Sequence, residues 1–300
     1  MKPGIVVLLS DLGLRDGYAG VLRGVILGID RNLHVVDLCH EVQPFAVLSA
    51  AYILYAAWDY FPEGSVFCAV VDPGVGSSRG TCLAQCQDRV LIGPDNGLVS
   101  LLARLRGGLE AYALDPAALP ARASAIALSA QASATALSAQ ASATALSAQA
   151  SAIELPATHA HARSATFHGR DLFAPAAALA ASSGPQRVRG PAIEPVLLPE
   201  VQPLREGAIL KGRVLHIDRF GNCISSLHAT DLENLDPERL RLRLRTARVR
   251  GLKRTYSDAP RGASLALLGS SGFLELALRE GSAAAKYGIR VGDSVILTQH

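Results

Sequence analysis

Strand-like and helix-like stretches alternate along the first third of this chain of 300 residues. Apolar runs predict strands at 5–9, 34–38, 65–71, 81–85 and 89–92, and helical patterns lie at 18–29, 44–60 and 98–105. This alternation predicts a largely parallel sheet with helices on both faces. In such sheets, ligands bind beyond the carboxyl ends of the strands, where Asp11 and Asp72 each follow a predicted strand.

The last third of the chain has only strand-like segments, at 207–217, 222–227, 239–250, 264–268 and 273–278. They predict a compact β-barrel-like domain over 207–300. A stretch with four prolines, 188–206, is the predicted linker. The predicted fold class is therefore α/β: a largely parallel N-terminal α/β domain over 1–187, followed by a smaller all-β domain.

A low-complexity insertion interrupts the N-terminal domain at about 122–153. The nonapeptide ALSAQASAT recurs with a period of nine from Leu128 through Leu137 and Leu146. On a helix, nine residues advance by about 900°, so successive leucines would fall on opposite faces and form no apolar stripe. We therefore predict a surface insertion without a packed core.

Charge and hydropathy restrict the partners. The formal net charge of +3 is too small to predict a polyanion partner. The alternation RLRLRLR at 239–245 lacks interleaved aromatics, so we predict an exposed strand face and no nucleic-acid partner. No run of about 18 apolar residues is present to span a membrane, and the apolar run at 5–9 is too short for a signal peptide. Five cysteines without metal-site spacing predict reduced thiols, no metal and a cytoplasmic location.

Two motifs carry reactive side chains: VVDPGVGSSR at 70–79 and TFHGRD at 166–171. They supply a carboxylate (Asp72), a guanidinium (Arg79) and an imidazole (His168). A guanidinium can stabilise developing hydroxide, and a carboxylate or imidazole can accept a hydrogen bond or a proton from water. Taken alone, Asp72 could equally cap the turn that it opens.

Both motifs closely resemble those of the S-adenosyl-L-methionine (SAM) hydroxide adenosyltransferases. The resemblance implies that Asp72, Arg79 and His168 are catalytic in the hydrolysis of SAM to adenosine and L-methionine, by attack of activated water on the ribose 5′ carbon, without a cofactor. One alternative is a SAM-dependent halogenase, but similar halogenases have tyrosine at the positions of Asp72 and His168, and the fluorinating type has serine at that of Gly169. A non-catalytic SAM or adenosine sensor is a second alternative.

The resemblance also implies a substrate site. Asp11 in SDLG would bind the ribose diol, and Ser270 in GSSGFLELALREGSAA the methionine carboxylate. The segment HIDRFGN would contribute Asp218 to the methionine ammonium, Phe220 to the adenine face and Asn222 to the adenine edge. Tyr256 would lie beside adenine or in the core, and Glu275 would recognise the amino acid or point outward from its strand.

Similar proteins are homotrimers whose sites lie between subunits, so the resemblance implies that arrangement here. Two further segments match the family, VVDLCHEV at 35–42 and PDNG at 94–97. We predict structural roles for both, His40 as a turn or interface residue and PDNG as a turn in which Gly97 takes a positive φ.

Overall fold

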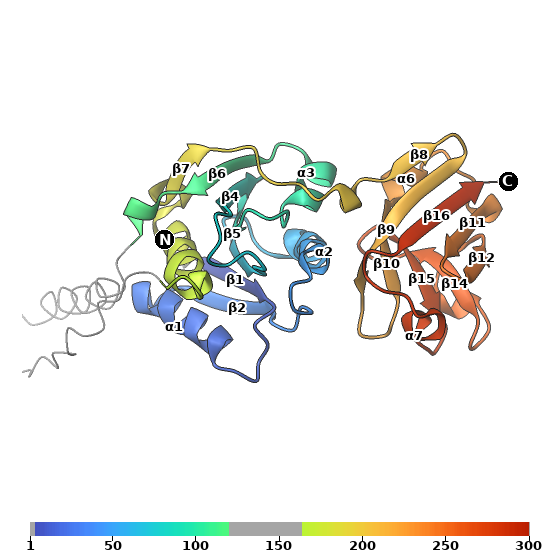
Figure 1. The fold of residues 1–300 in the computed structure, drawn as a ribbon, viewed down its shortest axis with the longest axis horizontal. Coiled ribbons are helices and arrows are strands. Elements are labelled where there is room, and N and C mark those ends of the chain that lie inside the picture. The colour runs from blue at the N-terminus through green and yellow to red at the C-terminus, as the bar shows by residue number, and fades with distance from the viewer. Residues whose placement is uncertain (1–3, 120–163, 300) are drawn as a thin grey trace, which may run out of the picture. The chain divides into compact units, whose positions relative to one another are not determined.

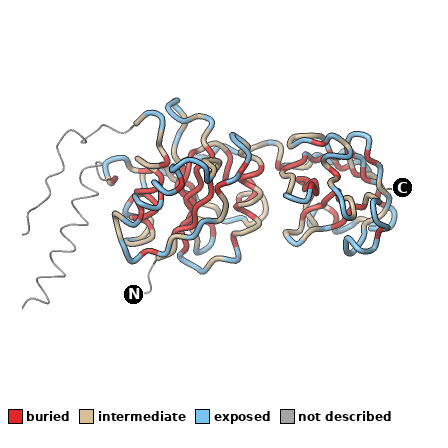
Figure 2. The backbone as a smooth tube through the Cα atoms, turned by 90° about the horizontal axis from the view of Figure 1, so that it is seen from below, coloured by how far each residue is buried: buried red, intermediate tan, exposed pale blue. Residues whose placement is uncertain are grey.

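The computed structural model describes residues 4–119 and 164–299 (Figure 1), so the predicted insertion at 122–153 lies outside the described residues. Contacts divide the chain into two compact units. One, here called the sheet unit, contains residues 1–45, 61–96 and 108–195; the other, the barrel unit, contains 46–60, 97–107 and 196–300. Each has its own buried core, coloured red in Figure 2.

The sheet unit is built on seven strands in the order β2-β1-β3-β5-β4-β6-β7. Their bounds are β1 Ile5–Ser10, β2 His34–Cys39, β3 Val66–Val70, β4 Thr81–Cys86, β5 Arg89–Pro94, β6 Glu110–Leu114 and β7 Arg189–Ala192. Pairing is parallel from β2 to β5 and antiparallel from β5 to β7. The α/β class is confirmed, with a mixed sheet, because two residues between β4 and β5 are too few for the crossover that a parallel pair needs.

Two helices complete the core of the sheet unit, α1 (Tyr18–Ile29) and α5 (Ala174–Ser183). Leu22 and Ile26 of α1 are fully buried with residues of β1 and β3. The alanines of α5 let its backbone approach the sheet closely, and α5 contacts β1, β3 and α1. Helix α5 therefore ties the segment that follows His168 to β1 and β3.

The barrel unit contains a nine-stranded, nearly closed sheet, which confirms the predicted barrel-like domain. Its strands are β8 Leu204–Glu206, β9 Ile209–Ile217, β10 Cys223–His228, β11 Leu240–Leu244, β12 Ala247–Arg250, β13 Leu252–Lys253, β14 Ser264–Leu268, β15 Phe273–Leu278 and β16 Ser294–Gln299. In β11 the leucines are buried and the arginines exposed, as the alternation predicts. Helices α6 (Ala229–Leu232) and α7 (Ala283–Tyr287) are short.

Single 3₁₀ turns lie at Trp58–Tyr60, Pro116–Ala118, Pro185–Arg187, Pro199–Val201, Pro237–Arg239 and Tyr256–Asp258. Within the described ranges, no helix is long and apolar enough to cross a membrane.

Helices α2 (Val47–Ala57) and α3 (Ser100–Arg106) belong to the barrel unit by their contacts, although the sequence assigned them to the domain 1–187. Helix α2 lies on β9: the Ser49 hydroxyl donates to the Leu215 carbonyl at 3.1 Å, and the Tyr52 ring stacks on His216. The predicted linker, 188–206, is also structured, since β7 pairs with β6 and β8 with β9.

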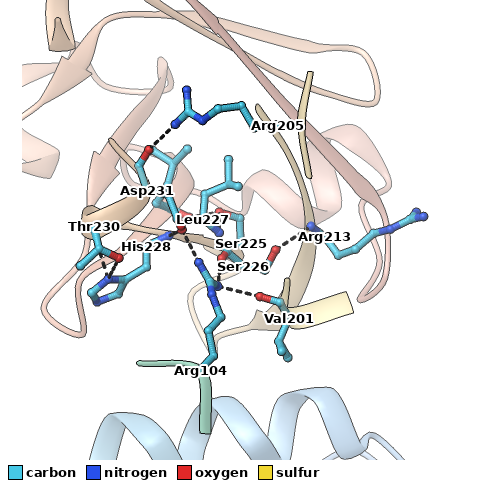
Figure 3. A network of polar contacts seen from close by, with 11 residues as sticks. Arg104, Val201, Arg205, Arg213, Ser225, Ser226, Leu227, His228, Thr230 and Asp231 are labelled. Atoms are coloured by element: carbon cyan, nitrogen blue, oxygen red, sulfur yellow. Dashed lines mark hydrogen bonds and ion pairs between the residues drawn. The ribbon is translucent and has the colours of Figure 1, made fainter. Parts of the chain in front are cut away.

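Arg104 of α3 joins that helix to the barrel (Figure 3). Its guanidinium donates to the carbonyls of Val201 at 2.6 Å and Ser226 at 2.7 Å, and forms an ion pair with Asp231. The side chain is 8% exposed. Asp231 also accepts a hydrogen bond from the His228 amide, so one buried guanidinium organises three segments of the barrel unit.

We expect Arg104→Met to lower the free energy of unfolding of the barrel unit by about 3 kcal/mol, because the variant removes the ion-pair partner of Asp231 and the donor to two carbonyls. The exposed Arg205, which donates to the Asp231 carbonyl, is the matched control: Arg205→Met should cost less than about 1 kcal/mol. Urea unfolding followed by fluorescence of the chain's single tryptophan, the buried Trp58, measures both. Equal effects would contradict this role of Arg104.

Candidate active site

The segment after β3 forms a tight turn that presents Asp72 and Arg79. Residues Val66–Val70 of β3 and Val71 are buried, which fixes the start of the turn. The amide of Val75 donates to the Asp72 carbonyl at 3.2 Å, so Asp72 does open a turn, as its alternative role predicts. Gly76 has φ +80°, and a Cβ there would lie 2.7 Å from the Ala165 carbonyl oxygen. A glycine is therefore needed for this turn to approach the segment that carries His168.

Asp72, Arg79 and His168 are in direct contact. Arg79 Nε donates to Asp72 Oδ1 at 2.9 Å, and Nη2 forms an ion pair with Asp72 Oδ2. The same Nη2 lies 2.6 Å from Nδ1 of His168. The Asp72 and Arg79 side chains are 7% and 11% exposed, so the pair is largely shielded from water. Because a guanidinium can only donate, Nδ1 of His168 accepts and the neutral ring carries its proton on Nε2.

The charges around His168 agree with a neutral ring. Burial, and after it the positive charge of Arg79, lower the pKa of the His168 imidazole below its ordinary value. The carboxylates of Asp72 and Asp171 act in the opposite direction but do not reverse the shift. His168 is therefore predominantly neutral at pH 7.

A π-helical turn, η4 (Gly169–Phe173), directly follows His168 and leads into α5. The centroid of its buried Phe173 ring lies 5.2 Å from the Arg79 guanidinium carbon, a cation–π contact. A Cβ on Gly169 would lie 3.0 Å from Val70 Cγ1 and 3.3 Å from Leu22 Cδ2. Position 169 thus has little room for a side chain.

Asp11 lies in the sheet unit at the end of β1. Its Oδ2 accepts a hydrogen bond from the Phe45 amide at 2.8 Å, and Phe45 has φ +67°, which is strained for a residue with a side chain. The neighbouring Ser10 hydroxyl lies 2.7 Å from His40 Nδ1, and both residues are buried. His40 is therefore an internal residue that supports the Asp11 turn, in addition to marking the turn that the sequence predicts.

Four of the predicted substrate-binding residues lie together in the barrel unit. Asp218, Phe220, Asn222 and Tyr256 line a cavity of about 600 Å³. Asp218 accepts from the Phe220 amide at 3.0 Å and from the Asn222 amide at 2.8 Å, which forms the turn, and its Oδ2 accepts from Asn222 Nδ2. Phe220 is 75% exposed, so it is accessible to a ligand at this cavity.

The same cavity has residues that sequence reasoning missed, Arg279 and Ser282 among them. Both lie in GSSGFLELALREGSAA, the motif that also contains Ser270, so their place in that motif was the available sequence signal. A Cβ on Gly221 would lie 2.0 Å from the Ser282 hydroxyl, so glycine is required where the two walls of the cavity meet.

Glu275 and Tyr256 are linked beside this cavity. The Tyr256 hydroxyl donates to Glu275 Oε2 at 2.9 Å. Glu275 is 6% exposed, so its alternative of an outward position is wrong, and burial raises the pKa of its carboxyl. Tyr256 is 43% exposed, so its alternative of a core ring is also wrong. Ser270 is exposed and does not line the cavity.

Most of the predicted residues thus fall into two groups, each within one unit. Asp72, Arg79 and His168 lie in the sheet unit, where Asp11 follows β1, the strand that pairs in parallel with β3. The second group lines the cavity of the barrel unit. Among the described residues, no group of three or more histidines, cysteines, aspartates or glutamates is placed to hold a metal ion.

Comparison with known proteins identifies the class. Residues 6–146 match the SAM hydroxide adenosyltransferase N-terminal domain, and residues 212–296 match the corresponding C-terminal domain. The chain therefore belongs to the SAM hydroxide adenosyltransferase family.

Individual relatives span nearly the whole chain. A protein of Thermus thermophilus named (R)-S-adenosyl-L-methionine hydrolase is 37% identical, over 99% of this chain and 100% of its own length. A protein of the same name from Salinispora arenicola is 34% identical, over 96% and 95%. A fluorinase of Nocardia brasiliensis is 28% identical, over 97% and 95%. The crystal structure of an uncharacterized conserved protein from Thermotoga maritima superposes with a TM-score of 0.76 at 27% identity, over 98% and 100%.

We expect the His168 ring to titrate with a midpoint below about 6.5 in NMR, because burial and Arg79 disfavour its charged form. Replacing Arg79 by Met should raise that midpoint, since the variant removes a positive charge and frees the Asp72 carboxylate to stabilise the imidazolium. A midpoint at or above 6.5 that does not respond to Arg79→Met would contradict the contact.

Proposed function

We propose that this protein hydrolyses SAM to adenosine and L-methionine by attack of an activated water on the ribose 5′ carbon. The observation that carries the proposal is the shielded contact of Asp72, Arg79 and His168, three groups able to orient and deprotonate water. The names of the hydrolase relatives, at up to 37% identity, support the same reaction.

The leaving group requires little help from the protein. The sulfonium of SAM departs as neutral methionine, so we propose that the reaction needs no cofactor. The protein must instead hold a water in line with the breaking carbon–sulfur bond and favour its deprotonated form. A fixed positive charge in a site that excludes water serves that purpose, and Arg79 supplies it.

The hydrogen-bond pattern assigns different parts to Asp72 and His168. Nδ1 of His168 is occupied by Arg79, and Nε2 carries the ring proton, so His168 can donate a hydrogen bond but has no free lone pair. Each oxygen of Asp72 accepts from Arg79 and retains a further lone pair. We therefore assign proton acceptance to Asp72 and orientation of the water to His168 Nε2.

A halogenase is the second candidate, since fluorinases are among the relatives. Asp72 disfavours it, because a carboxylate raises the cost of placing a halide in a shielded site. Gly169 disfavours the fluorinating type in particular. Similar fluorinating enzymes have a serine at this position, whereas here Val70 and Leu22 leave little room for a side chain. A sensor that only binds SAM has no use for a shielded proton acceptor.

We further propose that the cavity of the barrel unit binds SAM through Asp218, Phe220, Asn222 and Tyr256. Outside this cavity, we propose that Ser270 binds the methionine carboxylate, that Glu275 contributes to amino-acid recognition, and that Asp11 binds the ribose diol. The family resemblance also leads us to propose a homotrimer, in which each site takes its catalytic residues from one subunit and its cavity residues from a neighbour.

All five cysteines are free thiols, which supports a cytoplasmic location.

In ¹⁸O-labelled water containing chloride, we expect SAM to give methionine and adenosine labelled at its 5′ oxygen. A 5′-chloro product would establish the halogenase, and tight SAM binding without turnover would establish the sensor.

Asp72→Ala should lower kcat by about 10²–10⁴-fold while leaving adenosine binding intact, because the proton acceptor is lost and the cavity is untouched. Asp88→Asn, at an exposed turn between β4 and β5, is the control and should retain wild-type kcat.

The shared site predicts complementation between inactive variants. Asp72→Ala and Asn222→Ala, unfolded and refolded together in equal amounts, should regain about one quarter of the wild-type activity, because random trimers place two intact halves side by side at that frequency. Each variant refolded alone is the control. If both halves of a site came from the same chain, mixing would restore no activity.

A further inference from the structure

The turn at 94–97 contacts both ends of the segment that carries Asp72 and Arg79. Asn96 Nδ2 donates to the carbonyl of Val71, the residue before Asp72, at 2.8 Å. The amide of Asp95 donates to the carbonyl of Gly80, the residue after Arg79, at 3.1 Å. Two neighbouring residues of one turn thus hold the entry and the exit of the segment 71–80.

Sheet topology explains this arrangement. The strand order is β3-β5-β4, so the segment 71–80, which connects β3 to β4, must cross the carboxyl end of β5. The residues that follow β5 begin at that same end, because Pro94 pairs with Thr81 at the start of β4. The turn is closed by Gly97 at φ +103°, the positive φ predicted for PDNG.

Asn96 acts where strand pairing has stopped. The last residue of β3 in register with β5 is Cys68, and the last in register with β1 is Val70. The buried Val71 lies beyond both ladders, so its carbonyl needs a donor from elsewhere. The side-chain amide nitrogen of Asn96 is that donor, whereas no donor among the described residues reaches the Asn96 Oδ1. The structural role of the Asn96 side chain is therefore to donate a hydrogen bond.

We propose that Asn96 is a positioning residue for the reaction. By holding the Val71 carbonyl, it fixes the backbone from which Asp72 projects, and thereby the two-bonded contact with Arg79 that lets Nη2 reach His168. This inference rests on the proposed SAM hydrolysis. Asn96 donates hydrogen bonds to the carbonyls of Val71 and Pro94 and to none of the predicted substrate-binding residues. A substitution of Asn96 should therefore affect the chemical step and not the binding of SAM.

The test compares Asn96→Ala and Asn96→Asp with wild type in SAM hydrolysis. We expect kcat to fall by about 10–100-fold in both, because a small displacement of a reacting group has an effect of that size. The KM for SAM should stay within about twofold, since the binding groups are unchanged. Asn96→Asp keeps the shape of the side chain, but its carboxylate cannot donate to Val71.

Ser65→Ala is the matched control. The Ser65 hydroxyl donates to the Pro62 carbonyl at 2.7 Å, just before the opposite end of β3. Each alanine variant loses one side-chain-to-backbone hydrogen bond next to the same strand, so their decreases in Tm should be similar. Only the Asn96 variants should lose kcat. An equal loss in Ser65→Ala would show a general effect of strand stability and overturn the proposal.

A second measurement does not depend on turnover. Arg79 Nε–H is hydrogen-bonded to Asp72, so its NMR signal should exchange slowly with solvent in wild type and faster in Asn96→Ala, but not in Ser65→Ala. If wild type does not hydrolyse SAM, the proposed function fails while this exchange still tests the role of Asn96. A folded Asn96→Ala protein with wild-type kcat, or with unchanged Arg79 exchange, would overturn the proposal.

Discussion

The candidate active site depends on one guanidinium held in a largely dry environment. Arg79 binds both oxygens of Asp72, reaches Nδ1 of His168 and rests on the ring of Phe173. Such a charge is costly to bury unless it is paired and hydrogen-bonded, and here two of its partners, Asp72 and His168, also have a part in the proposed chemistry. Arg79 determines the tautomer of His168, lowers its pKa and leaves Asp72 as the group able to accept a proton.

The surrounding fold brings that guanidinium to its partners. Segment 71–80 crosses the end of β5, where the turn with Asn96 holds its two ends. Gly76 permits close approach to the Ala165 carbonyl, and the π-helical turn after His168 passes into α5, which packs on β1 and β3. The three reactive residues are thus anchored to buried elements, β3 on one side and α5 on the other, which limits their movement.

Sequence reasoning was sound where local pattern determines structure. Helix 18–29 and the leucine–arginine alternation of β11 agree with the structure, because both depend on periodic burial of apolar side chains. It was less complete where contacts between distant segments decide. The antiparallel half of the sheet follows from a two-residue connection, and the grouping of α2 and α3 with the barrel unit follows from Ser49, Tyr52 and Arg104 meeting partners more than 100 residues away.

The sequence by itself determined the reactive groups and the family, because long motifs state which side chains are present and in what local order. The tertiary structure decided what those groups can do. The burial of Asp72 and Arg79, the tautomer of His168, the closed space at Gly169 and the donor from Asn96 all arise from residues far apart in the chain. Electrostatic energies and hydrogen bonds depend on distance and solvent exposure, and neither is set until strands distant in sequence lie side by side.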